Sequence, residues 1–201
     1  MKKLMLCWLM LVPLSLAAQQ FGGGLTGGLV VSQVDGDGVG GFRKAGFSLG
    51  GFATYPLSDK LTLQPEIRVE QLGSSTPQFL VLRTTHVSVP MLVSFRLPIL
   101  LGETEYPLDI QAGPVVGVLL GARDFIGNDL STSLRRTDLR VQAGFAAHLS
   151  ERVSLGVRYG YSAYSFVPVR SGLPPIWQVT GQVGAYHNYI TFGLYWHVLD
   201  R

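Results

Sequence analysis

The segment LTLQPEIRVEQL, residues 61–72, alternates between apolar and polar side chains almost without interruption. Successive side chains of a β-strand point to opposite sides, so an extended segment of this kind has one apolar and one polar face. The apolar face carries Leu61, Leu63, Ile67 and Val69. In a soluble β-protein the charged face points to water, whereas in a barrel that crosses a membrane it points inward. The rest of the chain has to decide between these two orientations.

The chain begins with MKKLMLCWLMLVPLSLAAQQ, which has the layout of a secretory signal peptide. Two lysines precede an apolar run that ends at Leu16, and small residues suited to signal peptidase follow. The apolar run is too short for a membrane-spanning helix. We therefore expect residues 1–18 to be removed and residues 19–201 to form one exported domain. Cleavage would also remove Cys7, the only cysteine of the chain.

The charge composition favours an exterior that faces lipid. The formal net charge of +3 falls to +1 when the two lysines of the signal peptide are lost, so the mature chain has no basic excess that would indicate nucleic-acid binding. Charged residues make up 14% of the chain, against about 25% in an ordinary soluble domain. A soluble barrel needs a more charged exterior than this to stay monomeric.

Period-two segments recur after the signal peptide, each close to the roughly 9–11 residues that cross a bilayer as a tilted strand. We expect eight strands, near residues 22–33, 44–56, 60–72, 84–97, 107–122, 138–149, 152–165 and 187–198. Long connections at 34–43, 73–83, 123–137 and 167–186 alternate with shorter ones, the one at 98–106 being intermediate. This alternation is typical of outer-membrane barrels. The sequence therefore predicts an all-β, eight-stranded, antiparallel up-and-down transmembrane barrel with both termini in the periplasm.

The residues assigned to the inward faces are small or ionic, as the narrow interior of an eight-stranded barrel requires. Glycines recur there, and we expect a lumen ion-pair network made by Glu66, Arg68, Glu70, Arg96, Asp109, Asp138, Arg140 and Arg158. Aromatic residues form belts at both membrane interfaces of such barrels. We assign these interface aromatics to Phe21, Tyr55, Tyr106, Tyr159, Tyr161, Tyr189 and Trp196. A lumen filled in this way argues against free conduction, and a small-solute channel is the alternative.

The sequence resembles the PorT-like outer-membrane β-barrel family of Bacteroidota over nearly the whole mature chain. The most specific pieces are the strand–turn–strand around PLSDK, residues 56–60, and the AGP of the fifth expected strand, residues 112–114. The resemblance implies an eight-stranded barrel in the bacterial outer membrane, without catalytic residues or a cofactor. It also implies a link to export, since one founding member is tied to the type IX secretion system.

From the resemblance and the composition we expect a non-enzymatic protein whose extracellular loops bind or brace an envelope or secretion component. The expected partners are the lipid bilayer with its lipopolysaccharide, the barrel assembly machinery, and proteins of the envelope or of a secretion complex. Arg123, Arg135 and Arg136 crowd the third long loop. Arginine binds phosphate in a bidentate manner, so these residues are candidates for contact with lipopolysaccharide, the alternative being a solvated loop of mixed charge.

No motif of the sequence predicts a metal site, because the four histidines are scattered and no cysteine remains to join them. Some small outer-membrane barrels are lipases, acyltransferases or proteases, and one set of residues suits such chemistry. His86 and Ser88 share a face of the fourth expected strand, and Glu70 of the third is placed to neighbour them. Structural ion-pair networks bring the same residue types together, and we favour that interpretation. An outer-membrane enzyme acting on lipid is the alternative.

Overall fold

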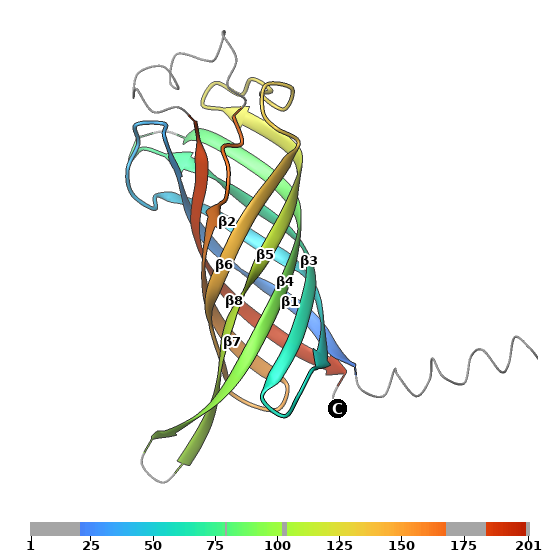
Figure 1. Ribbon diagram of the computed structural model, residues 1–201. Helices are drawn as coiled ribbons and strands as arrows, with labels where there is room; N and C mark the ends of the chain where they lie inside the picture. The colour runs from blue at the N-terminus through green and yellow to red at the C-terminus, as the bar shows by residue number, and fades with distance from the viewer. Residues whose placement is uncertain (1–20, 79, 102–103, 168–183, 200–201) are drawn as a thin grey trace, which may run out of the picture.

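The computed structural model describes residues 21–78, 80–101, 104–167 and 184–199, which form a closed antiparallel barrel (Figure 1). Each strand pairs with its neighbours in sequence order, and β1 pairs with β8 to close the sheet. The strands are β1 (Gly22–Asp35), β2 (Lys44–Pro56), β3 (Leu61–Ser75), β4 (Leu80–Leu101), β5 (Thr104–Asp124), β6 (Thr137–His148), β7 (Val153–Ser162) and β8 (Tyr186–Leu199). The expected signal peptide lies outside the described residues. Among those residues there is no helix of the length and hydropathy that a membrane span needs.

The two ends of the barrel differ in their connections. One end carries the start of β1 and the end of β8, together with the tight turns at residues 57–60 and 149–152; we call it the terminal end. The opposite end, called the loop end, carries the connections 36–43 and 125–136. In outer-membrane barrels the short turns are periplasmic and the longer loops are extracellular. The terminal end is therefore the periplasmic one.

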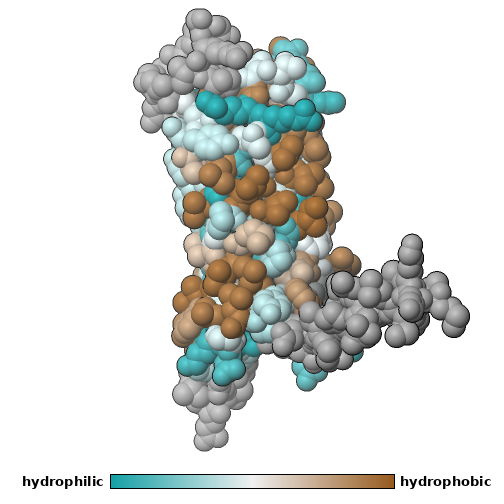
Figure 2. Space-filling model, turned by 45° about the vertical axis from the view of Figure 1, so that its right-hand side comes forward, coloured by the Kyte–Doolittle hydropathy of each residue, from teal (hydrophilic) through white to brown (hydrophobic). Residues whose placement is uncertain are grey.

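Strand β3 answers the question of orientation. Ile67 is 60% exposed on the outer surface, while Glu66 and Arg68 on either side of it are at most 3% exposed inside the barrel. On the face of the wall shown in Figure 2, apolar side chains gather over the middle and hydrophilic ones lie towards the two ends. Water is absent from the bilayer core, so every strand amide needs a partner there and the sheet has to close.

Two connections are shorter than the sequence predicted. The expected loop at 73–83 is mostly strand, since β3 continues to Ser75 and β4 begins at Leu80. The expected connection at 98–106 is also mostly strand, and β4 and β5 stay paired as far as Leu101 and Thr104. This hairpin projects beyond the barrel at the terminal end (Figure 1). The residues of this hairpin lack a clean polar–apolar alternation, so the sequence did not indicate strands here. The hydrogen-bonded pairing of β4 with β5 nevertheless continues through them.

Inward-facing glycines make room for the long side chains of the lumen. A Cβ added to Gly117 would lie 2.5 Å from a guanidinium nitrogen of Arg140, and one added to Gly160 would collide with the ring of Tyr189. Small residues on one strand thus accommodate large side chains from the neighbouring strand. This explains why the interior of the narrow barrel can hold arginines and tyrosines.

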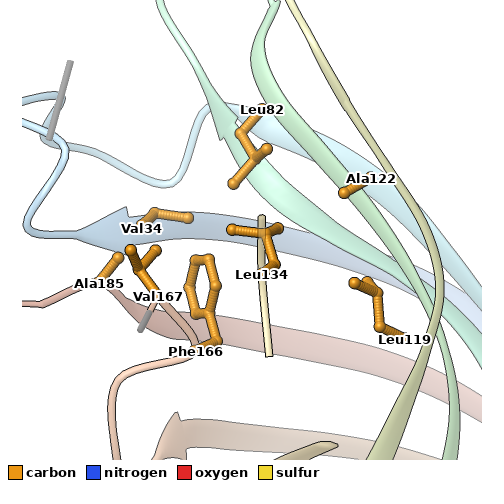
Figure 3. Packing of buried hydrophobic residues seen from close by; sticks show 8 residues of the cluster. All are labelled: Val34, Leu82, Leu119, Ala122, Leu134, Phe166, Val167 and Ala185. Carbon is orange, nitrogen blue, oxygen red and sulfur yellow. The ribbon is translucent and has the colours of Figure 1, made fainter. Parts of the chain in front are cut away.

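The loop end of the lumen is closed by an apolar cluster, shown in Figure 3. Its buried members are Val34, Leu82, Leu119, Ala122, Leu134, Phe166, Val167 and Ala185. Leu134 comes from the β5–β6 connection and Phe166 from the segment after β7, so residues beyond the strands fold over the end of the barrel. The amide of Arg135 donates to the carbonyl of Phe166, which joins the two segments above the lumen.

Candidate functional site

The middle of the lumen is filled by a chain of buried ion pairs. Arg158 donates to Glu66 over 2.7 Å, and Arg68 lies between two carboxylates, 3.4 Å from Glu66 and 3.7 Å from Glu70. Arg140 donates to the other side of Glu70 over 2.5 Å. All five side chains are at most 3% exposed. Buried charges are tolerated when they are paired and hydrogen-bonded, and this network fills the barrel at mid-height.

A second group of polar side chains lies between this network and the apolar cluster. Asp138 is 3.3 Å from the Nε of Arg140, and its Oδ2 is 2.9 Å from the Nδ1 of His187. His86, Asp138 and His187 each offer one ligand atom within 4.8 Å of the others, a spacing that can hold a metal ion. The carboxylate of Asp138 is already engaged by His187, by the positive charge of Arg140 and by the hydroxyl of Ser162. A cation would have to displace these contacts.

The three residues weighed for catalysis meet in the lumen, but not as a nucleophile and its base. The hydroxyl of Ser88 donates to Glu70 over 2.5 Å and accepts from Arg140 over 2.6 Å. No hydrogen bond joins Ser88 to His86, within the part of the chain that the structure describes, although the two share a face of β4. All of these side chains are at most 2% exposed. Ser88 is therefore a hydrogen-bond partner of the ion-pair network.

A cavity of about 700 Å³ opens at the terminal end of the barrel, below the ion-pair network. Five of its lining residues form a hydrogen-bonded chain. His148 is 2.8 Å from Asp109 through Nε2 and 3.0 Å from the hydroxyl of Ser154 through Nδ1. His197 contacts the same hydroxyl from the other side, also at 3.0 Å. Arg96 donates to Asp109 over 3.0 Å.

Serine, histidine and aspartate in this order are the groups of a nucleophile, a general base and an orienting carboxylate. Sequence reasoning missed this set because its members come from β5, β6 and β7 and lie far apart along the chain. The only available signal was their position on inward faces, close to the ends of their strands. The imidazole of His148 is turned relative to the usual triad, in which the serine faces Nε2.

Six of the seven expected interface aromatics have side chains that the structure describes, and five of these lie on the outer wall. Phe21, Tyr159, Tyr161 and Trp196 are exposed, and Tyr55 packs against Phe21 with ring centroids 5.0 Å apart. The side chain of Tyr106 lies outside the described part.

The assignment of Tyr189 to the interface was wrong. Its side chain is fully buried in the lumen, where the guanidinium of Arg140 lies 5.3 Å from its ring centroid. Its position in β8 has the inward parity of Thr191 and Tyr195, which are also buried. A step of one residue reverses the face of a strand. An aromatic side chain at the level of the membrane interface therefore points into the lumen when its position along the strand has the inward parity.

The arginines of the third loop lie at the loop end and are exposed. Arg123 is the penultimate residue of β5. The guanidinium of Arg135 lies 5.7 Å from the ring centroid of Tyr164. The backbone carbonyl of Arg136 accepts from the amide of Leu119, which docks this part of the loop on β5. The structure thus brings the three arginines to the loop end, each with different contacts.

The family model for the outer membrane protein beta-barrel domain matches residues 4–195. Among solved structures, Ail, the attachment invasion locus protein of Yersinia pestis, is 15% identical, with 89% of this chain and 99% of that chain covered at a TM-score of 0.49. Neisserial surface protein A is 16% identical, with 87% and 95% covered and a TM-score of 0.49. OprG from Pseudomonas aeruginosa is 13% identical, with 90% and 95% covered and a TM-score of 0.38. No curated protein matches the chain.

The fold and the family agree. The chain forms a closed eight-stranded barrel with an apolar wall and an ionic lumen, and the family match covers nearly all of it. The chain belongs to the outer membrane protein beta-barrel domain family and is a β-barrel protein of the bacterial outer membrane.

Proposed function

We propose that the chain is a non-enzymatic barrel that anchors extracellular loops for binding or bracing another component of the cell envelope. The observation that carries the proposal is the loop β5–β6, residues 125–136, which is held in a defined shape and presents large apolar side chains to water. Phe125 is 57% exposed and Ile126 is 67% exposed. Exposed apolar side chains on an ordered loop are typical of protein contact sites.

Asp124 organises the tip of this loop. Its carboxylate accepts hydrogen bonds from the amides of Ile126 and Asn128, over 3.0 and 2.8 Å, and from the side chain of Asn128 over 2.9 Å. At the base of the loop, the hydroxyl of Ser131 accepts from the amide of Ala122 over 3.0 Å. A loop fixed in this way loses little conformational entropy on binding, which favours a binding role.

The filled lumen supports an anchoring role over a transport role. The apolar cluster covers the loop end and the ion pairs fill the centre. The resemblance to the PorT-like family makes a component of a type IX-like secretion system the specific partner that we propose. Lipopolysaccharide of the surrounding leaflet is the partner proposed for arginines of the same end.

Site-specific photo-cross-linking on intact cells tests the loop contact. A photoreactive residue in place of Phe125 should give one discrete cross-linked protein, which should disappear when Ile126 is changed to Asp. The same photoreactive residue in place of Asp59, in a terminal-end turn, is the matched control and should not give that product. Identical products from both positions, or none from position 125, would contradict the proposal. If the captured protein is a secretion component, deletion of the loop tip should also lower the amount of exported cargo.

A second candidate function, hydrolysis of an ester such as a phospholipid, is favoured by the chain Asp109–His148–Ser154 in the terminal-end cavity. In such a reaction the Ser154 oxygen would bond to the acyl carbon while His148 takes the hydroxyl proton and passes it to the departing alcohol. Water would then release the acid and restore the serine. Hydrolysis lost in Ser154→Ala, together with labelling of Ser154 by a fluorophosphonate, would support this candidate. No turnover and no labelling of the folded protein would leave the binding role.

A further inference from the structure

The arginines of the loop end lack the carboxylate partners that the lumen arginines have. Every arginine in the central network is within 4.0 Å of a carboxylate. At the loop end, Asp124 and Asp129 instead accept hydrogen bonds from amides of their own loop. Within the described residues, no ion pair of this length joins a carboxylate to Arg83 or Arg123. Asp129 is close enough to Arg123 to interact with it electrostatically, but among the described residues neither arginine has a carboxylate at ion-pair distance.

Two of these arginines face each other across neighbouring strands. Arg83 of β4 lies directly opposite Arg123 of β5 in the antiparallel register. Their neighbours Leu82, Thr84 and Ala122 are at most 1% exposed inside the barrel, so the alternation places both arginines on the outer wall. Like charges directly opposite on one face of a sheet destabilise it. An anion bound between them would remove this cost.

The depth of the pair matches that of lipid headgroups. The next outward row towards the middle of the barrel is Thr85 opposite Gly121, and the apolar wall begins with Val87 and Leu120, which is 59% exposed. Two residues along a strand correspond to about 6–7 Å. The arginines therefore form the first charged row beyond the apolar band. Figure 2 shows hydrophilic side chains bordering that band.

We propose that Arg83 and Arg123 form a site for the phosphate group of a phosphorylated lipid in the outer leaflet. Two guanidinium groups can each present paired N–H donors to phosphate oxygens, a geometry that lysine does not offer. Basic side chains at the headgroup level of a membrane protein recognise lipid phosphates in this way. The site rests on the lipopolysaccharide contact proposed above for the arginines of this end and assigns it to a specific pair on the outer wall. It does not depend on the protein contact proposed for the tip of loop β5–β6.

Lipid retention measured by native mass spectrometry tests this site. The folded protein is purified in detergent, mixed with lipid A carrying its phosphates, and compared with the variant Arg83→Gln/Arg123→Gln. Charge-assisted hydrogen bonds are individually strong enough that losing two guanidinium groups should weaken retention by at least about tenfold. Arg152→Gln, which removes an exposed arginine in a turn of the opposite, terminal end, should retain lipid as the wild type does.

Two further arms identify the ligand. Dephosphorylated lipid A should be retained no better by the wild type than by the double variant. Inorganic phosphate at millimolar concentration should not displace the bound lipid; complete displacement would mean a site for free anions and would overturn the proposal. Equal retention of phosphorylated lipid by the double variant and the wild type would overturn it as well. Unchanged unfolding temperatures of the variants in detergent establish that the comparison is made between folded barrels.

Discussion

Replacing Arg140 by methionine should strongly destabilise the barrel, because this side chain joins two buried carboxylates. It is fully buried, donates to Glu70 over 2.5 Å, and lies 3.3 Å from Asp138. It also donates to the hydroxyl of Ser88 over 2.6 Å. Methionine preserves much of the volume, but it leaves Glu70 paired only with Arg68 and Asp138 paired only with His187. Removing one partner of a buried ion pair costs about 3–5 kcal/mol, and we expect the free energy of unfolding to fall within this range.

The measurement is denaturant unfolding of the protein in lipid vesicles or detergent, followed by tryptophan fluorescence and extrapolated linearly to water. Arg136→Met is the matched control, since Arg136 is an exposed arginine near the same strand and exposed substitutions usually change stability by about 0.5 kcal/mol or less. Adding Glu70→Gln to Arg140→Met should restore part of the loss, because it removes a buried carboxylate charge that has lost its closest cation. A loss below about 1 kcal/mol for Arg140→Met would refute the account of the lumen as a mutually dependent ion-pair network.

Three further predictions follow from the lumen and the loop end. Gly160→Ala should destabilise the barrel by about 1–3 kcal/mol through overpacking against Tyr189, and Tyr189→Leu in the same chain should recover part of it; equal unfolding midpoints for Gly160→Ala and the wild type would contradict the packing. Burial raises the pKa of the Asp37 carboxyl above its ordinary value of 3.8. The connection 36–43 should therefore be most protected from hydrogen exchange below pH 3.8 and should lose protection as the pH rises through the raised pKa. The same loss in Asp37→Asn would show that another group is responsible. Planar-bilayer recordings should give flat traces, because the ion pairs and the apolar cluster fill the lumen, whereas steady open steps of porin size would contradict this.

Parity along each strand was readable from the sequence because it is a local property. The alternation in residues 61–72 placed Ile67 outside and Arg68 inside without knowledge of any partner strand, and the structure has both in these positions. The same reasoning identified the eight strands to within a few residues over most of the chain. It failed in the β4–β5 hairpin, where local periodicity is weak. It also failed at Tyr189, which was assigned to the membrane interface from its position along the strand without regard to the face on which it lies.

Which side chains meet inside the barrel was decided only by closure of the sheet. Arg158 and Glu66 are 92 residues apart in the chain, yet they share a hydrogen bond, because curvature brings β7 and β3 to face each other across the lumen. The Asp109–His148–Ser154 chain and the opposed pair Arg83 and Arg123 likewise depend on strand register and on the shear of the barrel. A side-chain period of two specifies a face, whereas a partner requires the position of another strand, and that information exists only in the folded sheet.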